Sequence, residues 1–100
     1  MERINGVVCS TKHLTSEDND KLGWLSNTYV YNNNDWVHDT GYGYLIRLNA
    51  YRYPLLALKE RNISKSVRKL IYTLMKKEKI NMIHFDCDAD IIEGFEVFDW

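Results

Sequence analysis

Hydrophobic and polar residues alternate between positions 82 and 88, near the end of the chain. Ile83, Phe85 and Cys87 fall on one side of this pattern, and polar residues lie between them. A period of two residues is typical of a β-strand that turns one face to the core. After a polar break, residues 95–98 form a second run that favours strand structure. We therefore expect the end of the chain to fold back onto the sheet as a short strand.

Two segments have the periodicity and the end signals of α-helices. One follows Ser64, a favourable helix cap, and ends in the lysine-rich run 76–79. Its apolar residues recur at spacings of three and four: Val67, Leu70, Ile71, Leu74 and Met75. The other helix begins after Thr15, which forms a capping-box pattern with Asp18 three residues later. This helix is expected to end near residues 26–27.

The other segments predict a first strand, a central hairpin and one ambiguous connection. Residues 4–11 contain a short apolar run flanked by polar residues, which favours a strand. Residues 28–48 begin with strand formers and an Asn-rich turn, and they end in the alternating run 43–48, so they predict a hairpin or a three-stranded meander. For residues 49–63, the alternatives are a short helix opened by Pro54 and an irregular connection.

This order of elements predicts a single α+β domain over residues 1–100. A chain of this length is large enough for one core and too short to divide. Because each helix has one apolar face, we expect both helices on one face of a mainly antiparallel sheet. The predicted arrangement is βαββαβ, of the ferredoxin-like kind, with the short C-terminal strand added.

The composition is ordinary for a globular protein, with 45% hydrophobic residues and a net charge of -1. No apolar run is long enough for a membrane span, and the N-terminal apolar patch is too short for a signal peptide. We expect a cytoplasmic protein in which Cys9 and Cys87 are buried thiols and not a disulfide. The charge is nevertheless uneven, because residues 59–79 carry a net +6 and residues 80–100 a net -6.

Three motifs together resemble a family of short bacterial and phage proteins of unknown function, common on prophages, plasmids and other mobile elements. The motifs are Ser10-Thr11-Lys12-His13-Leu14, Gly43-Tyr44-Leu45-Ile46, and an ending that runs from Phe85-Asp86-Cys87-Asp88 to Phe98-Asp99-Trp100. The chain departs from the family pattern at Ala89-Asp90, where a glycine turn is usual. The resemblance implies a mobile-element context, in which small interaction proteins and inhibitors of host defence are frequent, and it implies no established activity.

Carboxylates follow the last core strand at alternate positions, as Asp86, Asp88 and Asp90. Oxygen ligands in this pattern suit a hard cation such as Mg²⁺ or Ca²⁺, although the glycine and second helix of a calcium loop are missing. His84 shares a strand face with Asp86, and His13 precedes a helix. If the first and last strands are neighbours, His13 would approach the carboxylates and form an acid-base or metal site. The alternative is that the carboxylates are exposed turn residues and the histidines are packed or capping residues.

Two surfaces are candidates for binding a partner. A basic helix face would meet the phosphates of a nucleic acid or stay solvated. The acidic, aromatic ending would dock on a partner protein or complete the core. The residues concerned are Lys65, Arg68, Lys69 and Lys76 on the helix, and Glu96, Phe98 and Trp100 in the ending.

The spacing of residues shows no nucleophile paired with a base. We therefore expect a small non-catalytic interaction or accessory protein of a mobile element or prophage, without a cofactor, whose partner is another protein. One alternative is a metal-dependent hydrolase or nucleotide-binding site at Asp86, Asp88 and His13. A second alternative is nucleic-acid binding through the basic face of residues 65–76.

Overall fold

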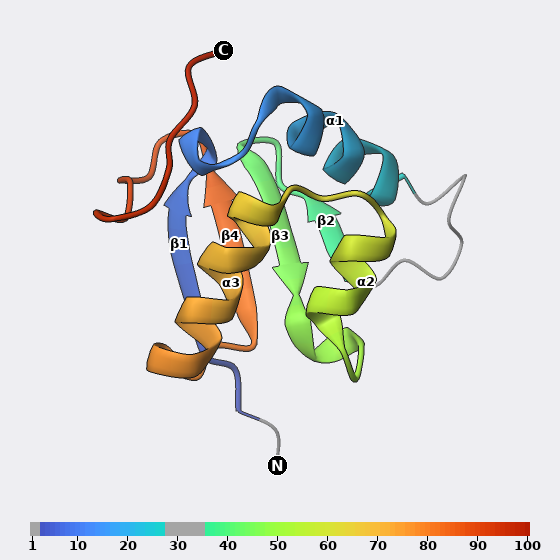
Figure 1. Ribbon diagram of the computed structural model, residues 1–100. Coiled ribbons are helices and arrows are strands. Elements are labelled where there is room, and N and C mark those ends of the chain that lie inside the picture. Colours follow the sequence, from blue (N-terminus) through green and yellow to red (C-terminus); the bar gives the residue numbers. More distant parts are fainter. Residues whose placement is uncertain (1–2, 28–35) are drawn as a thin grey trace.

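A four-stranded β-sheet forms one layer of the protein, and two helices cover one of its faces (Figure 1). The computed structural model describes residues 3–27 and 36–100. Its strands are β1 (Gly6–Ser10), β2 (Val37–Asp39), β3 (Gly43–Arg47) and β4 (Met82–Asp86). Its helices are α1 (Ser16–Leu25), α2 (Pro54–Glu60) and α3 (Lys65–Glu78), with short 3₁₀ helices η1 (Thr11–His13) and η2 (Leu48–Ala50). The predicted α+β class is confirmed.

The strand order is β1-β4-β3-β2, and the sheet is mixed. β1 and β4 run parallel, with Ser10 beside Asp86, whereas β3 is antiparallel to both of its neighbours. This order differs from the predicted ferredoxin-like one, because β1 lies at an edge of the sheet and not in its interior. β4 lies inside the sheet, where Ile83 and Phe85 are fully buried, while Val8 of the edge strand stays exposed. The strand with the fullest apolar face therefore has neighbours on both sides.

The helix with the clearest sequence pattern is α3, which is confirmed. Its apolar positions are buried against the sheet, and Ser64 accepts a hydrogen bond from the N–H of Val67 as the helix cap. For residues 49–63 the helical alternative is correct, since α2 begins at Pro54. The described residues thus contain three α-helices: the two that the sequence pattern predicted, and the short helix opened by Pro54 that was one of two alternatives. In Figure 1, α2 and α3 lie in front of the sheet, and α1 lies near the end where β1 and β4 finish.

Helix α1 begins at the predicted capping box and is bonded there to α3. Thr15 and Asp18 exchange hydrogen bonds between side chain and backbone, at 3.0 and 3.2 Å. The Asp18 carboxylate is 1% exposed and also accepts the backbone N–H (2.8 Å) and the hydroxyl (2.6 Å) of Ser64. Because Asp18 lies between the N-terminal ends of two helices, their partial positive charges stabilise its negative charge.

The chain after β4 is irregular, so the short strand predicted at residues 95–98 is wrong. We call residues 87–100 the C-terminal arm; it passes beside η1 (Figure 1). Five hydrogen bonds join the arm to residues 10–14. Three are Ser10 N–H to Asp90 O (2.9 Å), Phe98 N–H to Lys12 O (2.7 Å) and Trp100 Nε1–H to Leu14 O (2.8 Å). The other two join the ring of His13 to Ile92 N–H and to Glu96 O, each at 2.8 Å. Since the partner segment is a 3₁₀ turn and its flanks, it presents no extended edge along which a ladder of strand bonds could form.

The two cysteines are both free, but they differ in exposure. Cys9 is buried as expected, whereas Cys87 is exposed, because β4 ends at Asp86 and Cys87 lies in the following turn. In residues 3–27 and 36–100, no helix has the length and apolar character needed to cross a membrane. The strand and turn expected at residues 28–35 lie outside the described residues.

Candidate functional site

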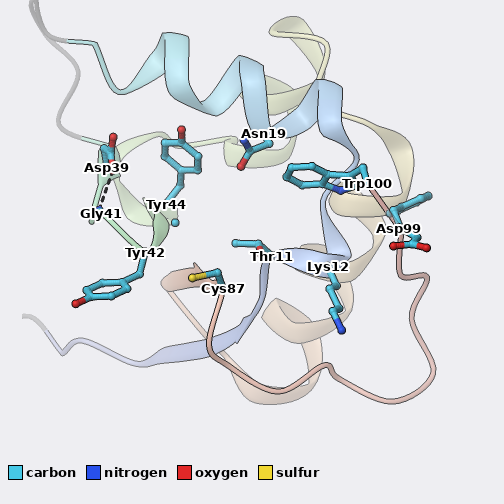
Figure 2. A pocket seen from close by; sticks show the side chains of 12 residues that line it. Thr11, Lys12, Asn19, Asp39, Gly41, Tyr42, Tyr44, Cys87, Asp99 and Trp100 are labelled. Carbon is cyan, nitrogen blue, oxygen red and sulfur yellow. Dashed lines mark hydrogen bonds between the residues drawn. The ribbon is translucent and has the colours of Figure 1, made fainter.

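An open depression of about 610 Å³ lies where β1 and β4 end and β3 begins (Figure 2). Because β1 and β4 are parallel, their carboxyl ends meet at this edge of the sheet, together with η1, the start of α1 and the C-terminal arm. The lining residues are Thr11, Lys12, Asn19, Asp39, Gly41, Tyr42, Gly43, Tyr44, Cys87, Phe98, Asp99 and Trp100.

The hairpin between β2 and β3 reaches the depression because Gly43 packs directly on the backbone of β4. A Cβ atom at Gly43 would lie 1.8 Å from the carbonyl oxygen of Phe85, so only glycine permits this approach. Beyond it, the N–H of Cys87 donates to the carbonyl of Tyr42 at 2.8 Å. The hairpin is therefore held closely against the end of β4, which fixes the floor of the depression.

The tip of the hairpin is a tight turn that presents an aromatic ring. Asp39 Oδ1 accepts the N–H of Gly41 at 2.8 Å, and Gly41 has a φ of 82°, which glycine adopts without strain. Tyr42 follows, with 61% of its surface exposed. In Figure 2 its ring points outward from the hairpin. The local sequence thus builds a rigid turn that holds Tyr42 at the rim.

A second depression of about 450 Å³ continues from the first along α1. The two share Asn19 and Tyr44, and the second is also lined by Asp20, Gly23, Trp24 and Asn27. The Tyr44 hydroxyl lies 3.0 Å from the position that a Cβ atom on Gly23 would occupy, so this glycine makes room for the phenol. We call the combined depression the α1 groove. It extends along the helix from Trp100 to Trp24.

The α1 groove carries more negative than positive charge. Asp20, Asp39 and Asp99 line it, whereas Lys12 is the one base among the described lining residues. Burial raises the pKa of the Tyr44 phenol, and the carboxylates of Asp39 and Asp20 raise it further. The phenol therefore stays protonated and neutral at ordinary pH.

The thiol of Cys87 also lies in the groove and is kept neutral. Partial desolvation raises its pKa, and the carboxylates of Asp88 and Asp86 act in the same direction. A nucleophilic cysteine requires the opposite shift, because the thiolate is the reactive form. Cys87 is thus poorly suited to nucleophilic catalysis in this position.

His13 is an anchor for the C-terminal arm. It is 2% exposed, and both ring nitrogens are bonded to the arm's backbone. Nε2 accepts the N–H of Ile92 at 2.8 Å, so Nδ1 carries the proton and donates to the carbonyl of Glu96, also at 2.8 Å. This neutral tautomer leaves no ring nitrogen to act on the carboxylates of Asp86 and Asp88. Although β1 and β4 are neighbours as the prediction required, both ring nitrogens of His13 bond the backbone of the arm and not these carboxylates.

The other predicted metal and acid-base residues lie at the end of β4. Ligand atoms of Asp86, Cys87 and Asp88 lie within 4.8 Å of one another, and this group includes neither Asp90 nor a histidine. Asp86 Oδ1 accepts the N–H of Asp88 at 2.8 Å, which is a local turn interaction. His84 Nε2 hydrogen-bonds with the hydroxyl of Thr40 at 2.9 Å. A cation at these carboxylates stays a prediction.

The predicted partner-binding residues are divided between two surfaces. Phe98 and Trp100 line the α1 groove, whereas Glu96 lies further back on the arm. Lys65, Arg68, Lys69 and Lys76 all lie on α3. Two of these bases have partners within the fold: Arg68 Nε donates to the carbonyl of Ile63 at 3.1 Å, and Lys76 Nζ lies 5.6 Å from the centre of the Tyr72 ring.

Sequence reasoning missed three residues that shape the groove, Asn19, Trp24 and Asp39, whereas Tyr44 stands in the motif Gly43-Tyr44-Leu45-Ile46. One signal was available for Trp24, since a large apolar residue stood beside the helix positions expected to be buried. Asn19 and Asp39 belong to no motif, and they reach the groove because the sheet and α1 bring separate elements together.

The fold and the groove define a small α+β domain with one aromatic, negatively charged depression at the end of its sheet. The family model described as "Family of unknown function (DUF5983) C-terminal domain" matches residues 6–100, and the chain belongs to this family. No curated protein and no solved structure matches the chain.

Proposed function

We propose that this protein is a non-catalytic interaction domain that binds an extended segment of another protein in the α1 groove. The proposal is carried by one observation: large aromatic side chains along the groove are left open to water. Trp24, Tyr42 and Trp100 are 61%, 61% and 59% exposed. Tryptophan and tyrosine are enriched at protein interfaces, where covering most of an indole contributes roughly 2 kcal/mol.

The groove is prepared for binding before a partner arrives. Trp100 is held by the bond from its Nε1–H to the carbonyl of Leu14, and the hairpin that presents Tyr42 is fixed on β4. A surface that is already ordered loses little conformational entropy when a ligand binds. These contacts favour recognition of an extended segment along α1.

The ionisable groups of the groove support binding over catalysis. Tyr44 and Cys87 both have a raised pKa, so neither is prepared to act as a base or a nucleophile at neutral pH. His13 has both ring nitrogens bonded to the arm. Among the described residues that line the groove there is no histidine. The motif resemblance supports placing the interaction in a mobile element or prophage.

A peptide-display selection on the immobilised domain, followed by fluorescence titration of the selected peptides, tests the proposal. Trp24→Ala is the decisive variant, because the indole is exposed on α1 and its loss leaves the core intact. We expect it to weaken selected peptides by about tenfold or more, equivalent to ~1.4 kcal/mol. Tyr53→Ala is the matched control, since Tyr53 is 63% exposed but lies outside the groove.

Two results would contradict the proposal. One is a set of peptides that bind wild type and Trp24→Ala equally, which would place the interaction elsewhere. The other is a selection without binders, combined with turnover in a hydrolase screen with Mg²⁺ or Mn²⁺. That second result would favour a metal-dependent hydrolase site at the carboxylates of Asp86 and Asp88.

A further inference from the structure

We propose that the segment bound in the α1 groove is basic, and that an arginine or lysine side chain enters the wider part of the groove near Tyr44 and Asp39. This inference rests on the proposed function and adds the chemistry of the partner. It is argued from the charge of the lining, the field within the groove and the aromatic rings.

The lining charge favours a cation. Asp20, Asp39 and Asp99 face one lining base, Lys12, whose side chain extends away from Asn19 in Figure 2. Within residues 3–27 and 36–100, the carboxylate oxygens of Asp20 and Asp99 accept no side-chain hydrogen bond, although Asp20 keeps its backbone bonds in α1. Asp39 uses one oxygen, Oδ1, for the N–H of Gly41. These carboxylates therefore keep acceptor capacity that a guanidinium or ammonium group can use.

The phenol of Tyr44 lies beside two of the lining carboxylates. Burial raises its pKa most, and the charges of Asp39 and Asp20 raise it further. Both carboxylates are therefore close enough to attract a positively charged side chain beside the phenol.

The aromatic rings make the groove suitable for arginine in particular. Tyr44 and Trp100 line the wider part, and Trp24 lines the far end. A guanidinium group stacks on aromatic faces and donates to carboxylates in its own plane, and both kinds of partner are present here. A neutral or acidic peptide would satisfy the rings and leave the carboxylates unpaired or repelled. Charge complementarity thus selects a basic segment.

Fluorescence anisotropy with three labelled peptides of one backbone tests the inference. The three peptides differ only at the central residue, which is arginine, citrulline or glutamate. Citrulline keeps the shape of the arginine side chain and lacks its positive charge. We expect the arginine peptide to bind the domain about tenfold more tightly than the citrulline peptide, and the glutamate peptide more weakly still. The preference should shrink when the salt concentration is raised from about 0.05 to about 0.5 M.

The double variant Asp39→Asn, Asp99→Asn should reduce the preference for arginine to about threefold or less. Glu60→Gln is the matched control, because Glu60 is an exposed carboxylate on α2 outside the groove, and it should leave the preference unchanged. Equal binding of the arginine and citrulline peptides would overturn the inference. So would an arginine preference that persists in the double variant.

Other outcomes separate this inference from the function on which it rests. If display selection yields groove-binding peptides without basic residues, the interaction domain stands and the basic partner is wrong. If free arginine or spermidine displaces the peptide at equal concentration, the groove is a site for small cations and the inference fails. It also fails if sedimentation velocity shows a dimer that Asp39→Asn dissociates, because the occupant is then the basic face of a second copy.

Discussion

Replacing His13 by leucine removes two hydrogen bonds while keeping a buried side chain of similar volume. The imidazole donates to the carbonyl of Glu96 and accepts the N–H of Ile92, each at 2.8 Å, and it is 2% exposed. A net hydrogen bond contributes about 1 kcal/mol, and a partly buried group left without a partner adds to the loss. We therefore expect His13→Leu to lower the free energy of unfolding by roughly 2–3 kcal/mol.

For a domain of this size, one kcal/mol corresponds to a change of roughly 4–8 °C in Tm. Circular dichroism should therefore record a Tm lower by roughly 10–20 °C in His13→Leu. Amide exchange at Ile92 should become faster, because its N–H loses the imidazole acceptor. Exchange in α3 should change less, since α3 makes no hydrogen bond with the arm among the described residues.

Glu96→Ala is the matched control for this experiment. His13 bonds the backbone carbonyl of residue 96 and not the exposed carboxylate, so the variant keeps the bond and should melt within about 2 °C of wild type. The reasoning is refuted if His13→Leu also melts within about 2 °C of wild type, or if Ile92 exchanges at an unchanged rate.

Gly43→Ala should destabilise the domain by roughly 3 kcal/mol or more, measured by urea unfolding, because its Cβ would lie 1.8 Å from the carbonyl oxygen of Phe85 and force β3 away from β4. Alkaline pH should weaken the contribution of Cys9, whose burial raises its pKa from 9.0 to about 12. Above about pH 9 the unfolded thiol ionises while the folded one stays neutral, so stability falls by about 1.4 kcal/mol per pH unit.

Each of these two predictions has a simple control. Gly6→Ala places a Cβ no closer than 3.5 Å to its neighbours and should change stability little, so a comparable loss there would contradict the steric argument for Gly43. Cys9→Ala removes the ionisable thiol, so its stability relative to wild type should improve steadily as the pH rises from 9 to 11. A constant difference between the two proteins would show that the folded thiol ionises normally.

The sequence predicted the elements whose burial is periodic and missed what depends on pairing between elements. The alternation of Ile83 and Phe85 and the helical spacing of Val67, Leu70 and Ile71 follow directly from burial on one face, and both are found. The strand order could not be predicted, because an alternation of apolar and polar residues is found in edge strands and in interior strands. In the structure β1 lies at the edge of the sheet, so the strand order differs from the ferredoxin-like order.

The C-terminal arm and the groove were hidden for a related reason. The run at residues 95–98 has strand-forming composition, yet its backbone partners are a histidine ring and a 3₁₀ turn, which no periodicity records. The groove combines Asn19 from α1 with Tyr44 from β3 and Trp100 from the arm. A sequence can indicate that such residues are exposed or aromatic, but their meeting is a property of the tertiary structure.

The carboxylate of Asp18 joins the helix that walls the α1 groove to the start of α3. It accepts bonds from Ser64 while capping the helix that carries Asn19 and Trp24. Because one carboxylate serves the first turn of α1 and the cap of α3, loss of that carboxylate would weaken both helix ends at once.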